Sequence, residues 1–368
     1  MSDDPRDGSR RGGPTATGDW LTGPGLLADP DQEGLPGQPR QAAGAGASRG
    51  WQVAWATGGR VPGHDAEVRA VAAAVLDGRP VAVTGSADST VRIWDLATGE
   101  RLGGPLWGHT GEVCAVATAL VGGRLVAVTG SSDQSVRRWD LATGQRLGGP
   151  LNAYDGGVSA VAVAERAGLP IAVSGGVGRT ARVWDLATGE QAGAPLTGHT
   201  GWVQAVATTV LDGRPVAVTG SGVRRGMVRV WDLATGRQLG RPLSGHTGPV
   251  CALATAVLDG RPVAVSGGED ATARVWDLAA GKPVGEPLTG HSDRVWAVTT
   301  AVLDGRVVAV TGSRDGTVRF WEPATGGQLG EALVLPGVRA LAAAPGGRLL
   351  VGRLLVGFGD EVALLAHR

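Results

Sequence analysis

Hydrophobic residues recur along most of the chain in short blocks that have the length and spacing of β-strands. In the first full unit, an apolar segment at 68–72 is followed by an unbroken apolar run at 81–84, and a third segment ends in Trp94-Asp95. Short apolar runs bounded by turn residues are typical of strands that are buried on both faces. A fourth segment begins after Leu-Ala-Thr-Gly at 96–99. The pattern predicts a four-stranded antiparallel meander in each unit.

Turn residues separate the predicted strands. Asp-Gly pairs stand between the first two strands of four units, as at Asp77-Gly78. Both central positions of such a tight hairpin need positive φ, which Asp and Gly tolerate, and Gly99 can serve the later hairpin loop in the same way. We expect the Asp-Gly and Leu-Ala-Thr-Gly turns to open on one face of the molecule and the remaining loops on the other.

The units follow one another at a nearly constant interval. A Trp-acid pair occurs six times, at intervals of 45, 45, 47, 45 and 45 residues, and a Gly-His pair precedes five of these pairs. The Trp-acid pairs are Trp94-Asp95, Trp139-Asp140, Trp184-Asp185, Trp231-Asp232, Trp276-Asp277 and Trp321-Glu322. Self-similarity at a period of 20 to 50 residues predicts a repeat architecture.

On these Trp-acid and Gly-His pairs, residues 51–368 resemble the WD-repeat β-propellers. Six complete units run from about 64 to 334, and a seventh is expected to combine segments from both chain ends. Residues 338–342 supply its inner strand, 348–366 two more strands, and 51–56 the fourth. We therefore expect an all-β, seven-bladed propeller over residues 50–368, of four-stranded antiparallel blades, in which the N-terminal strand closes the last blade. Such closure removes exposed sheet edges.

Two segments stand apart from this pattern. Residues 1–49 are rich in Gly, Pro, Arg, Asp and Gln without periodicity, so we expect a disordered tail or linker there. Residues 347–351 are repeated at once as 352–356, an insertion that could bulge or misalign the last blade.

Composition and charge narrow the function classes. The formal net charge is zero, so there is no electrostatic case for nucleic acid or an anionic membrane as partner. The start of the chain lacks the basic and apolar regions of a signal peptide, and no apolar run approaches the ~18 residues of a membrane helix. Cys114 and Cys251 occupy the same position in repeats three apart, which makes a disulfide between them improbable. We expect a reduced cytoplasmic protein, and the richness in Ala, Gly, Val and Arg points to a GC-rich bacterial source.

Four repeats hold a His, a Ser or Thr, an Asp and a Trp at fixed offsets. The sets are His64, Thr84, Asp88 and Trp94; His109, Thr129, Asp133 and Trp139; His246, Ser266, Asp270 and Trp276; and His291, Thr311, Asp315 and Trp321. A hydroxyl, an imidazole and a carboxylate could form a nucleophile and its base. A catalytic triad is needed only once, however, and the resemblance implies a buried hydrogen-bonded chain that holds each blade. We interpret these residues as structural.

The third and fourth repeats depart from this set. The third has Tyr154 in place of the histidine and Gly178 in place of the aspartate. The fourth keeps His199, but its turn at 222–226 is two residues longer and has no aspartate. We expect these two blades to be the least stable, and the departures are equally compatible with function and with drift.

The resemblance implies that partners bind at the loops on the Gly-His side and at the entrance between the inner strands. The repeats differ in the loops after the Gly-His pair, including positions three and five after the histidine, and before the turn aspartate. Trp and Arg are enriched at interface hot spots. One candidate patch is Trp202 with Arg224 and Arg225, and another is Arg294, Trp296 and Arg314. Further candidates at these positions are Glu67, Arg69, Glu112 and Gln204. Packing at the rim explains the two tryptophans equally well.

The predicted function is a non-catalytic scaffold, a monomeric ring without cofactor or metal, that binds a protein or peptide on one face. The resemblance adds that such rings are often the sensing or docking part of a signalling system. The alternative is a propeller hydrolase or lyase that uses the central channel. The predicted inner strands are rich in Ala, Val and Thr, with Glu165 as the lone carboxylate nearby, so catalysis is disfavoured.

Overall fold

The computed structural model describes residues 51–56, 63–152, 156–303, 305–335, 337–344, 353–358 and 361–367, with the backbone alone for the first and last two of these ranges. Spatial clustering divides the chain into two units, Met1–Gln38 and Pro39–Arg368, and all described residues belong to the second. The predicted tail at 1–49, Tyr154 and most of the duplicated segment at 347–356 lie outside the described residues.

The described residues form β-strands joined by turns, in the order that the repeats predict. The first three repeats contain β2 (Val68–Leu76), β3 (Arg79–Ser86), β4 (Val91–Asp95), β5 (Val113–Val121), β6 (Arg124–Ser131), β7 (Ser135–Asp140), β8 (Leu151–Asn152), β9 (Val158–Arg166), β10 (Leu169–Gly176) and β11 (Ala181–Asp185). The next three contain β12 (Val203–Leu211), β13 (Arg214–Ser221), β14 (Met227–Asp232), β15 (Gln238–Ser244), β16 (Val250–Leu258), β17 (Arg261–Gly268), β18 (Ala273–Asp277), β19 (Lys282–Leu288), β20 (Val295–Leu303), β21 (Arg306–Ser313), β22 (Thr317–Trp321) and β23 (Leu333–Val334). The chain ends contribute β1 (Trp51–Ala56), β24 (Val338–Ala343), β25 (Arg353–Phe358) and β26 (Glu361–His367).

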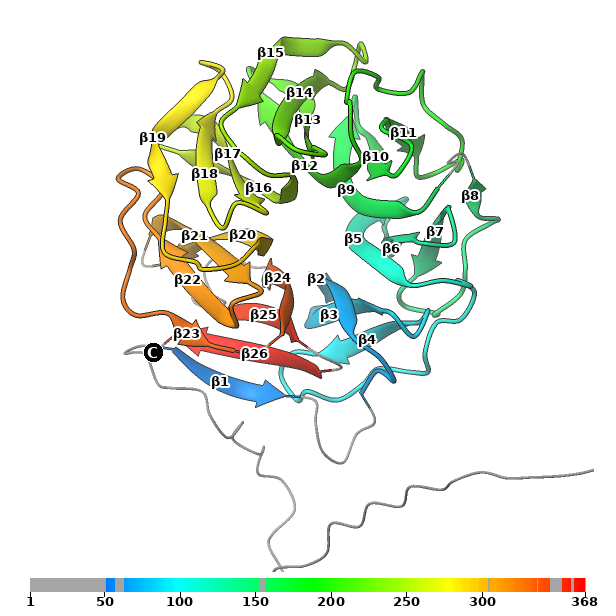
Figure 1. Cartoon of the computed structure of the whole chain (residues 1–368). Helices are drawn as coiled ribbons and strands as arrows, with labels where there is room; N and C mark the ends of the chain where they lie inside the picture. Colours follow the sequence, from blue (N-terminus) through cyan, green and yellow to red (C-terminus); the bar gives the residue numbers. More distant parts are fainter. Residues whose placement is uncertain are drawn as a thin grey trace, which may run out of the picture. The chain divides into compact units, whose positions relative to one another are not determined.

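These strands form seven antiparallel sheets arranged around a central opening, as in a β-propeller (Figure 1). Six sheets are blades that each come from one continuous repeat, and the seventh is a composite sheet of order β1-β26-β25-β24. In the first and third blades the fourth segment pairs only through isolated bridges, such as Val91 with Leu106 and Ala181 with Leu196. The innermost strands contact their neighbours around the whole ring, and β24 contacts both β20 and β2.

The predicted pairing of the two chain ends is confirmed. β1 runs antiparallel to β26, with Trp51 opposite His367 and Ala56 opposite Ala363, and the register shifts between Val53 and Trp55. The strand that begins the described chain is thus the outermost strand of the composite sheet (Figure 1).

The core lies between successive blades. One cluster joins Val81, Val83 and Ile93 of the first blade to Trp139 and Leu141 of the second. A glycine after the buried hydroxyl of each second strand allows this close approach. A Cβ on Gly85, for example, would lie 2.5 Å from a methyl carbon of Val113 in the next blade. The repeated Thr-Gly or Ser-Gly dipeptide is therefore a packing requirement between blades.

The predicted turns are confirmed as well. Asp77 and Gly78 have φ values of 48° and 77°, as a hairpin turn with positive φ at both central positions requires. Because β2, β3 and β4 alternate in direction, the turns after β2 and β4 lie on one face, here called the turn face. The Gly-His loops lie on the opposite face, here called the Gly-His face.

Removal of β1 is expected to destabilise the ring. A chain that begins after Ala56 exposes the edge of β26, whereas a chain that begins at Trp51 keeps the pairing. We expect the longer deletion to lower the midpoint of thermal unfolding by about 5 °C or more relative to the shorter one, with increased aggregation. Equal midpoints by differential scanning fluorimetry would show that the pairing carries no stability.

Candidate functional site

A buried chain of hydrogen bonds crosses each of the four regular repeats. In the first, Trp94 Nε1 donates to Thr84 Oγ1 at 2.8 Å, and Thr84 Oγ1 lies 2.7 Å from His64 Nε2. His64 Nδ1 lies 2.8 Å from Asp88 Oδ2. The same contacts recur in the second, fifth and sixth repeats, among His109, Thr129, Asp133 and Trp139; His246, Ser266, Asp270 and Trp276; and His291, Thr311, Asp315 and Trp321. We call each such set a tetrad.

The aspartate of each tetrad connects the loop after the Gly-His pair to the turn in which the aspartate itself lies. Asp88 accepts hydrogen bonds from the backbone N–H groups of Asp65 and Thr90, at 3.0 and 2.8 Å, and from the Thr90 hydroxyl at 2.6 Å. Each such bond nets about 1 kcal/mol of stability, while a buried orphaned donor or acceptor costs roughly 1–3 kcal/mol. The geometry of the tetrad is therefore that of a structural clamp.

The two irregular repeats keep different parts of this clamp. In the third, Trp184 Nε1 donates to Ser174 Oγ at 2.6 Å, and Gly178 offers no carboxylate. In the fourth, Thr219 still contacts His199, and Ser221 hydrogen-bonds with His199 Nδ1 in the place of the missing aspartate. Sequence reasoning missed this serine. The signal available was that most regular repeats carry a serine at the same position.

Burial and hydrogen bonding shift the pKa values of the tetrad residues. Burial, followed by the charge of Arg229, lowers the pKa of His199 to about 4. Burial also lowers the pKa of His109 and of His291, although the facing carboxylates oppose the shift. Burial alone would raise the pKa of Asp133, but hydrogen bonds from Ser135 and His109 outweigh it and lower the pKa to about 2. At neutral pH, His199 is therefore neutral and Asp133 is ionised.

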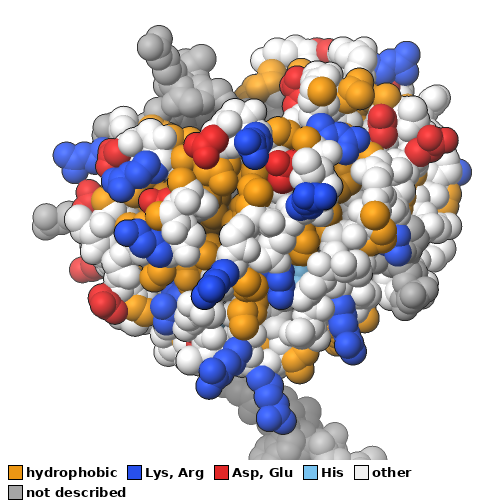
Figure 2. All heavy atoms as spheres, turned by 90° about the horizontal axis from the view of Figure 1, so that it is seen from above, with side chains coloured by type: hydrophobic (Ala, Val, Ile, Leu, Met, Phe, Trp, Pro, Cys, Tyr) orange, Lys and Arg blue, Asp and Glu red, His pale blue; other side chains and the backbone are white. Residues whose placement is uncertain are grey.

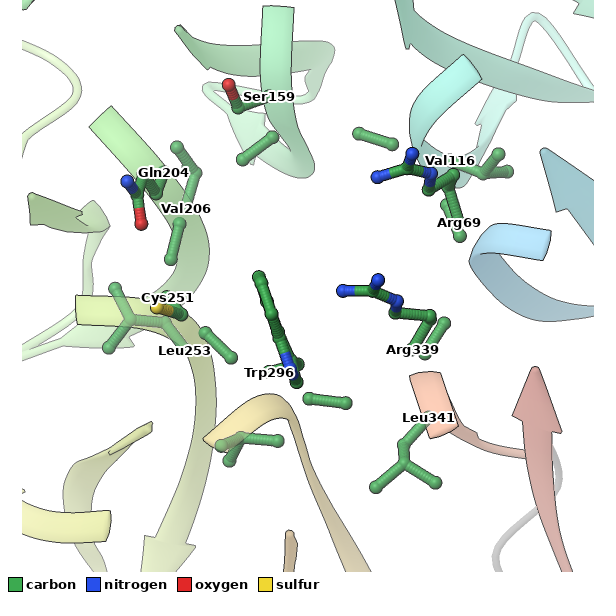
Figure 3. A pocket seen from close by; sticks show the side chains of 18 of the residues that line it. Arg69, Val116, Ser159, Gln204, Val206, Cys251, Leu253, Trp296, Arg339 and Leu341 are labelled. Carbon is green, nitrogen blue, oxygen red and sulfur yellow. The ribbon is translucent and has the colours of Figure 1, made fainter. Parts of the chain in front are cut away.

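A second group of residues surrounds the mouth of the central channel on the Gly-His face. The second residues of six inner strands, which stand five residues after the Gly-His histidine or its equivalent, line a cavity of about 160 Å³ (Figure 3). They are Arg69, Ser159, Gln204, Cys251, Trp296 and Arg339. Of these, Arg69, Gln204 and Trp296 are candidates predicted from the repeats. Arg339 was not predicted because no Gly-His pair precedes it, although Val338-Arg339-Ala340 repeats Val68-Arg69-Ala70.

Ion pairs connect the arginines of this channel mouth across the junction between β24 and β2. Arg339 Nε lies 2.6 Å from Glu67 Oε1, and Arg69 Nε lies 3.1 Å from Glu67 Oε2. Arg69 also pairs with Glu112 at 3.2 Å. All four side chains are partly exposed, so these pairs orient the arginines more than they stabilise the fold.

Trp296 stands in the channel mouth with a guanidinium beside its ring (Figure 3). The Arg339 guanidinium carbon lies 4.5 Å from the ring centroid, and that of Arg294 lies 5.8 Å from it. Arg294 is also held by Glu269 at 2.8 Å. Arg314, predicted to share this patch, instead has Asp293 as its acidic neighbour at 3.9 Å. The mouth thus combines an aromatic ring with cations, which suits stacking and anion contact.

The other predicted patch lies on the fourth blade. Trp202 is 52% exposed, and Arg224 and Arg225 are exposed in the longer turn. The loop of Trp202 touches this turn through the preceding glycine, because a Cβ on Gly201 would lie 2.7 Å from the backbone carbon of Gly222. The structure therefore brings the two loops together.

The described surface carries both acidic and basic side chains. Acidic and basic side chains are interspersed with small hydrophobic patches on the side of the molecule in Figure 2. Burial, followed by the charge of Glu269, raises the pKa of the Cys251 thiol to about 12, so this thiol is protonated and a poor nucleophile. The described residues contain no group of three potential metal ligands and no helix that is long and apolar enough to cross a membrane.

The loss of tetrad bonds predicts faster local opening of the third blade. Its indole bond to Ser174 survives without the aspartate that clamps the regular repeats. Since each missing bond is worth about 1 kcal/mol, we expect its strand amides to exchange tenfold or more faster than those of the second blade, with the fourth blade between them. Hydrogen exchange followed by mass spectrometry measures this. Equal protection in the second and third blades would contradict it.

The lowered pKa of His199 predicts a loss of stability in mild acid. Its folded pKa of about 4 lies below the ordinary value of 6.5. The contribution of neutral His199 is therefore complete above pH 6.5 and is lost as the pH falls toward 4. The shift corresponds to roughly 3 kcal/mol in the free energy of unfolding. In urea denaturation, the free energy of unfolding should decrease less between pH 7 and pH 4.5 for His199→Gln than for the parent protein. A decrease of the same size in both would contradict the assignment.

Comparison with known proteins agrees with this geometry. A family model described as WD domain, G-beta repeat matches residues 56–95, 101–140, 237–277 and 281–322. A comparison with curated proteins finds no match. The four matched segments contain the Trp-acid pairs of the four repeats with complete tetrads, and they lie on blades of a β-propeller. The chain therefore belongs to the WD-repeat family of β-propellers.

Proposed function

We propose that the protein is a non-catalytic scaffold that binds a protein or peptide partner at the channel mouth on the Gly-His face. The observation that supports this most is the arrangement of Arg339 against the Trp296 ring, with Arg69 linked to Arg339 through Glu67. Trp and Arg are the residue types that carry most binding energy at interfaces. Here the ion pairs with Glu67 orient both arginines before a partner arrives, which lowers the entropy cost of binding.

We also infer that the composite sheet acts as the seventh blade of the ring. Its inner strand β24 contacts β20 on one side and β2 on the other, as the inner strands of adjacent blades do. In this role the sheet supplies Arg339 to the channel mouth. A site built from the sixth blade, the composite sheet and the first blade is complete only when the ring is closed.

A closed ring with a pre-formed mouth suits the sensing or docking part of a signalling system. The chemistry of the mouth favours this role over the alternative of a channel hydrolase or lyase. Among the described residues that line the cavity, none is a carboxylate or an imidazole, and the nearby carboxylate of Glu67 is paired with Arg69 and Arg339. Carboxylates and imidazoles are the groups most often used in general acid–base catalysis.

The channel mouth can be tested by quantitative affinity capture from the native host. We expect Trp296→Ala and Arg339→Gln each to reduce capture of the partner tenfold or more, as truncation of a hot-spot residue does. Trp107→Ala is the matched control, because Trp107 is 67% exposed and lies outside the channel mouth. Trp202→Ala tests the patch on the fourth blade in the same experiment. Unchanged capture by both channel-mouth variants, with thermal midpoints equal to that of the parent, would refute the site.

A further inference from the structure

The Gly-His face of the fourth blade exposes two large apolar side chains next to two arginines. Trp202 stands three residues after the histidine of this blade and is 52% exposed, and Val223 in the longer turn is 69% exposed. Arg224 and Arg225 follow Val223 directly and are exposed as well. We call these four residues the fourth-blade patch. Aromatic and arginine side chains are the types most enriched at interface hot spots.

Close backbone contacts fix the two loops that carry this patch. A Cβ on Gly201 would lie 2.9 Å from a methyl carbon of Val223, so the loop after the Gly-His pair touches the longer turn. On the far side of the turn, a Cβ on Gly226 would lie 2.5 Å from the carbonyl oxygen of Gly248 in the fifth blade. Ser221 at the start of the turn keeps a hydrogen bond to the buried histidine of this blade. A turn held at both ends lowers the entropy cost of binding.

The corresponding loops of the four regular blades all carry carboxylates. These are Asp65, Glu67 and Asp88 in the first blade, Glu112 and Asp133 in the second, Glu269 and Asp270 in the fifth, and Asp293 and Asp315 in the sixth. In the fourth blade, by contrast, the loop at 198–203 and the turn at 221–227 contain none. The neighbouring segments at 176–180 of the third blade and 245–250 of the fifth contain none either. These segments therefore present cations without acids.

Arg224 and Arg225 take part in none of the ion pairs formed among the described residues. The two carboxylates of the fifth-blade turn are engaged by other groups. Glu269 lies 2.8 Å from an arginine of the sixth blade, and Asp270 lies 3.0 Å from the histidine of its own tetrad. Both exposed guanidinium groups thus keep their donors for an acceptor from outside the chain. A carboxylate matches the fork of a guanidinium with two parallel hydrogen bonds.

The missing aspartate also changes the charge balance inside the fourth blade. In the first and second blades the tetrad aspartate lies 3.8 and 4.0 Å from the arginine of the third strand, Arg92 or Arg137. The equivalent Arg229 hydrogen-bonds with the uncharged Gln238 instead. After burial, the charge of Arg229 is the second cause of the lowered pKa of His199, and no carboxylate opposes it as carboxylates do in the second and sixth blades. A partly buried cation thus adds to the two exposed ones.

We propose that the fourth-blade patch binds an acidic peptide segment of a partner protein, in which two aspartates or glutamates lie within three residues of a large apolar side chain. The carboxylates pair with Arg224 and Arg225, and the apolar side chain packs against Trp202 and Val223. Cations without acidic neighbours beside an exposed apolar surface are complementary to that chemistry.

A peptide fits this surface better than a nucleic acid does. Proteins that bind single strands combine several stacking rings with a positively charged groove along the backbone. The patch offers one exposed ring and two exposed cations, and the formal net charge of the chain is zero. The fourth blade also lies across the central opening from the composite sheet that supplies Arg339 (Figure 1). The inference therefore does not depend on the proposed function at the channel mouth.

The selectivity can be tested on the full chain with 12-residue fluorescent peptides. Each peptide has a central Leu, Phe or Trp with two Asp or Glu residues within three positions of it. One matched set carries Asn or Gln in place of the acids, and a second carries Ser in place of the apolar residue. We expect the best acidic–apolar peptides to bind about tenfold or more tightly than their matched counterparts, by fluorescence anisotropy. Equal binding of the three sets, no binding by any, or equally tight binding of a fluorescent single-stranded DNA would overturn the proposal.

Charge reversal tests the pairing directly. We expect the double variant Arg224→Glu, Arg225→Glu to weaken binding of the selected peptide about tenfold or more. The same variant should bind a version of that peptide with Lys in place of both acids more tightly than the parent protein does. Trp202→Ala should weaken binding of the selected peptide about tenfold. If the double variant kept the parent's preference for the acidic peptide, the assignment of the arginines would be wrong.

Matched changes in other blades provide the controls. Arg314→Glu alters an arginine of the equivalent turn in the sixth blade, 61% exposed and beside Asp293, and Trp107→Ala alters a tryptophan that is 67% exposed. We expect both to leave peptide binding unchanged. Trp296→Ala should also leave it unchanged, which separates this patch from the channel mouth. The proposal fails if these controls weaken binding as much as the changes in the patch, in variants whose thermal midpoints equal that of the parent.

Discussion

The antiparallel pairing of β1 with β26 is the interaction on which the rest of the structure depends. It joins residues as far apart as Trp51 and His367, and it leaves β26 without a free edge. The cost of closing so long a loop grows only with the logarithm of its length, so a few paired residues can offset it. Closure also sets β24 beside β2, where Arg339 meets Glu67 from 272 residues away. The channel mouth is therefore a product of the chain ends as much as of the repeats between them.

The elements that could be predicted from the sequence are those whose causes are local. The period predicted the order of the strands, although the first and third blades form three-stranded sheets instead of the four strands expected. The Asp-Gly pairs located hairpins because few residues tolerate positive φ at both central positions. Ser221 could not be assigned in this way. Its hydroxyl points to His199 only because the fourth repeat lacks an aspartate there, and in the first repeat the equivalent Ser86 bonds to the carbonyl of Ala66 instead. The position of a residue within the repeat predicts where it lies in the blade. Its hydrogen-bond partner depends on which neighbouring polar groups are still without a partner after the blade has packed.

The same reasoning explains why the candidate surfaces were only partly foreseen. Arg69 and Trp296 stand at fixed offsets from a histidine, so comparison of repeats singled them out. Arg339 belongs to a repeat without that marker, and its role became visible through its contacts with Glu67 and Trp296.

Departures from the repeat consensus therefore have two distinct physical consequences. In the third blade Gly178 stands where the regular repeats have the aspartate of the tetrad, so the clamp of the turn is lost, while the bond from Trp184 to Ser174 remains. In the second blade Leu120 and Gly122 stand where other repeats have valine and aspartate, in an exposed turn that keeps its positive-φ backbone. The complete tetrad of His109 stabilises this blade. A stable blade can vary its turn without loss of fold, and a varied turn on a rigid blade presents side chains in a fixed geometry. The departures that preserve the clamp are thus the better candidates for recognition, and those that break it are better explained as tolerated losses.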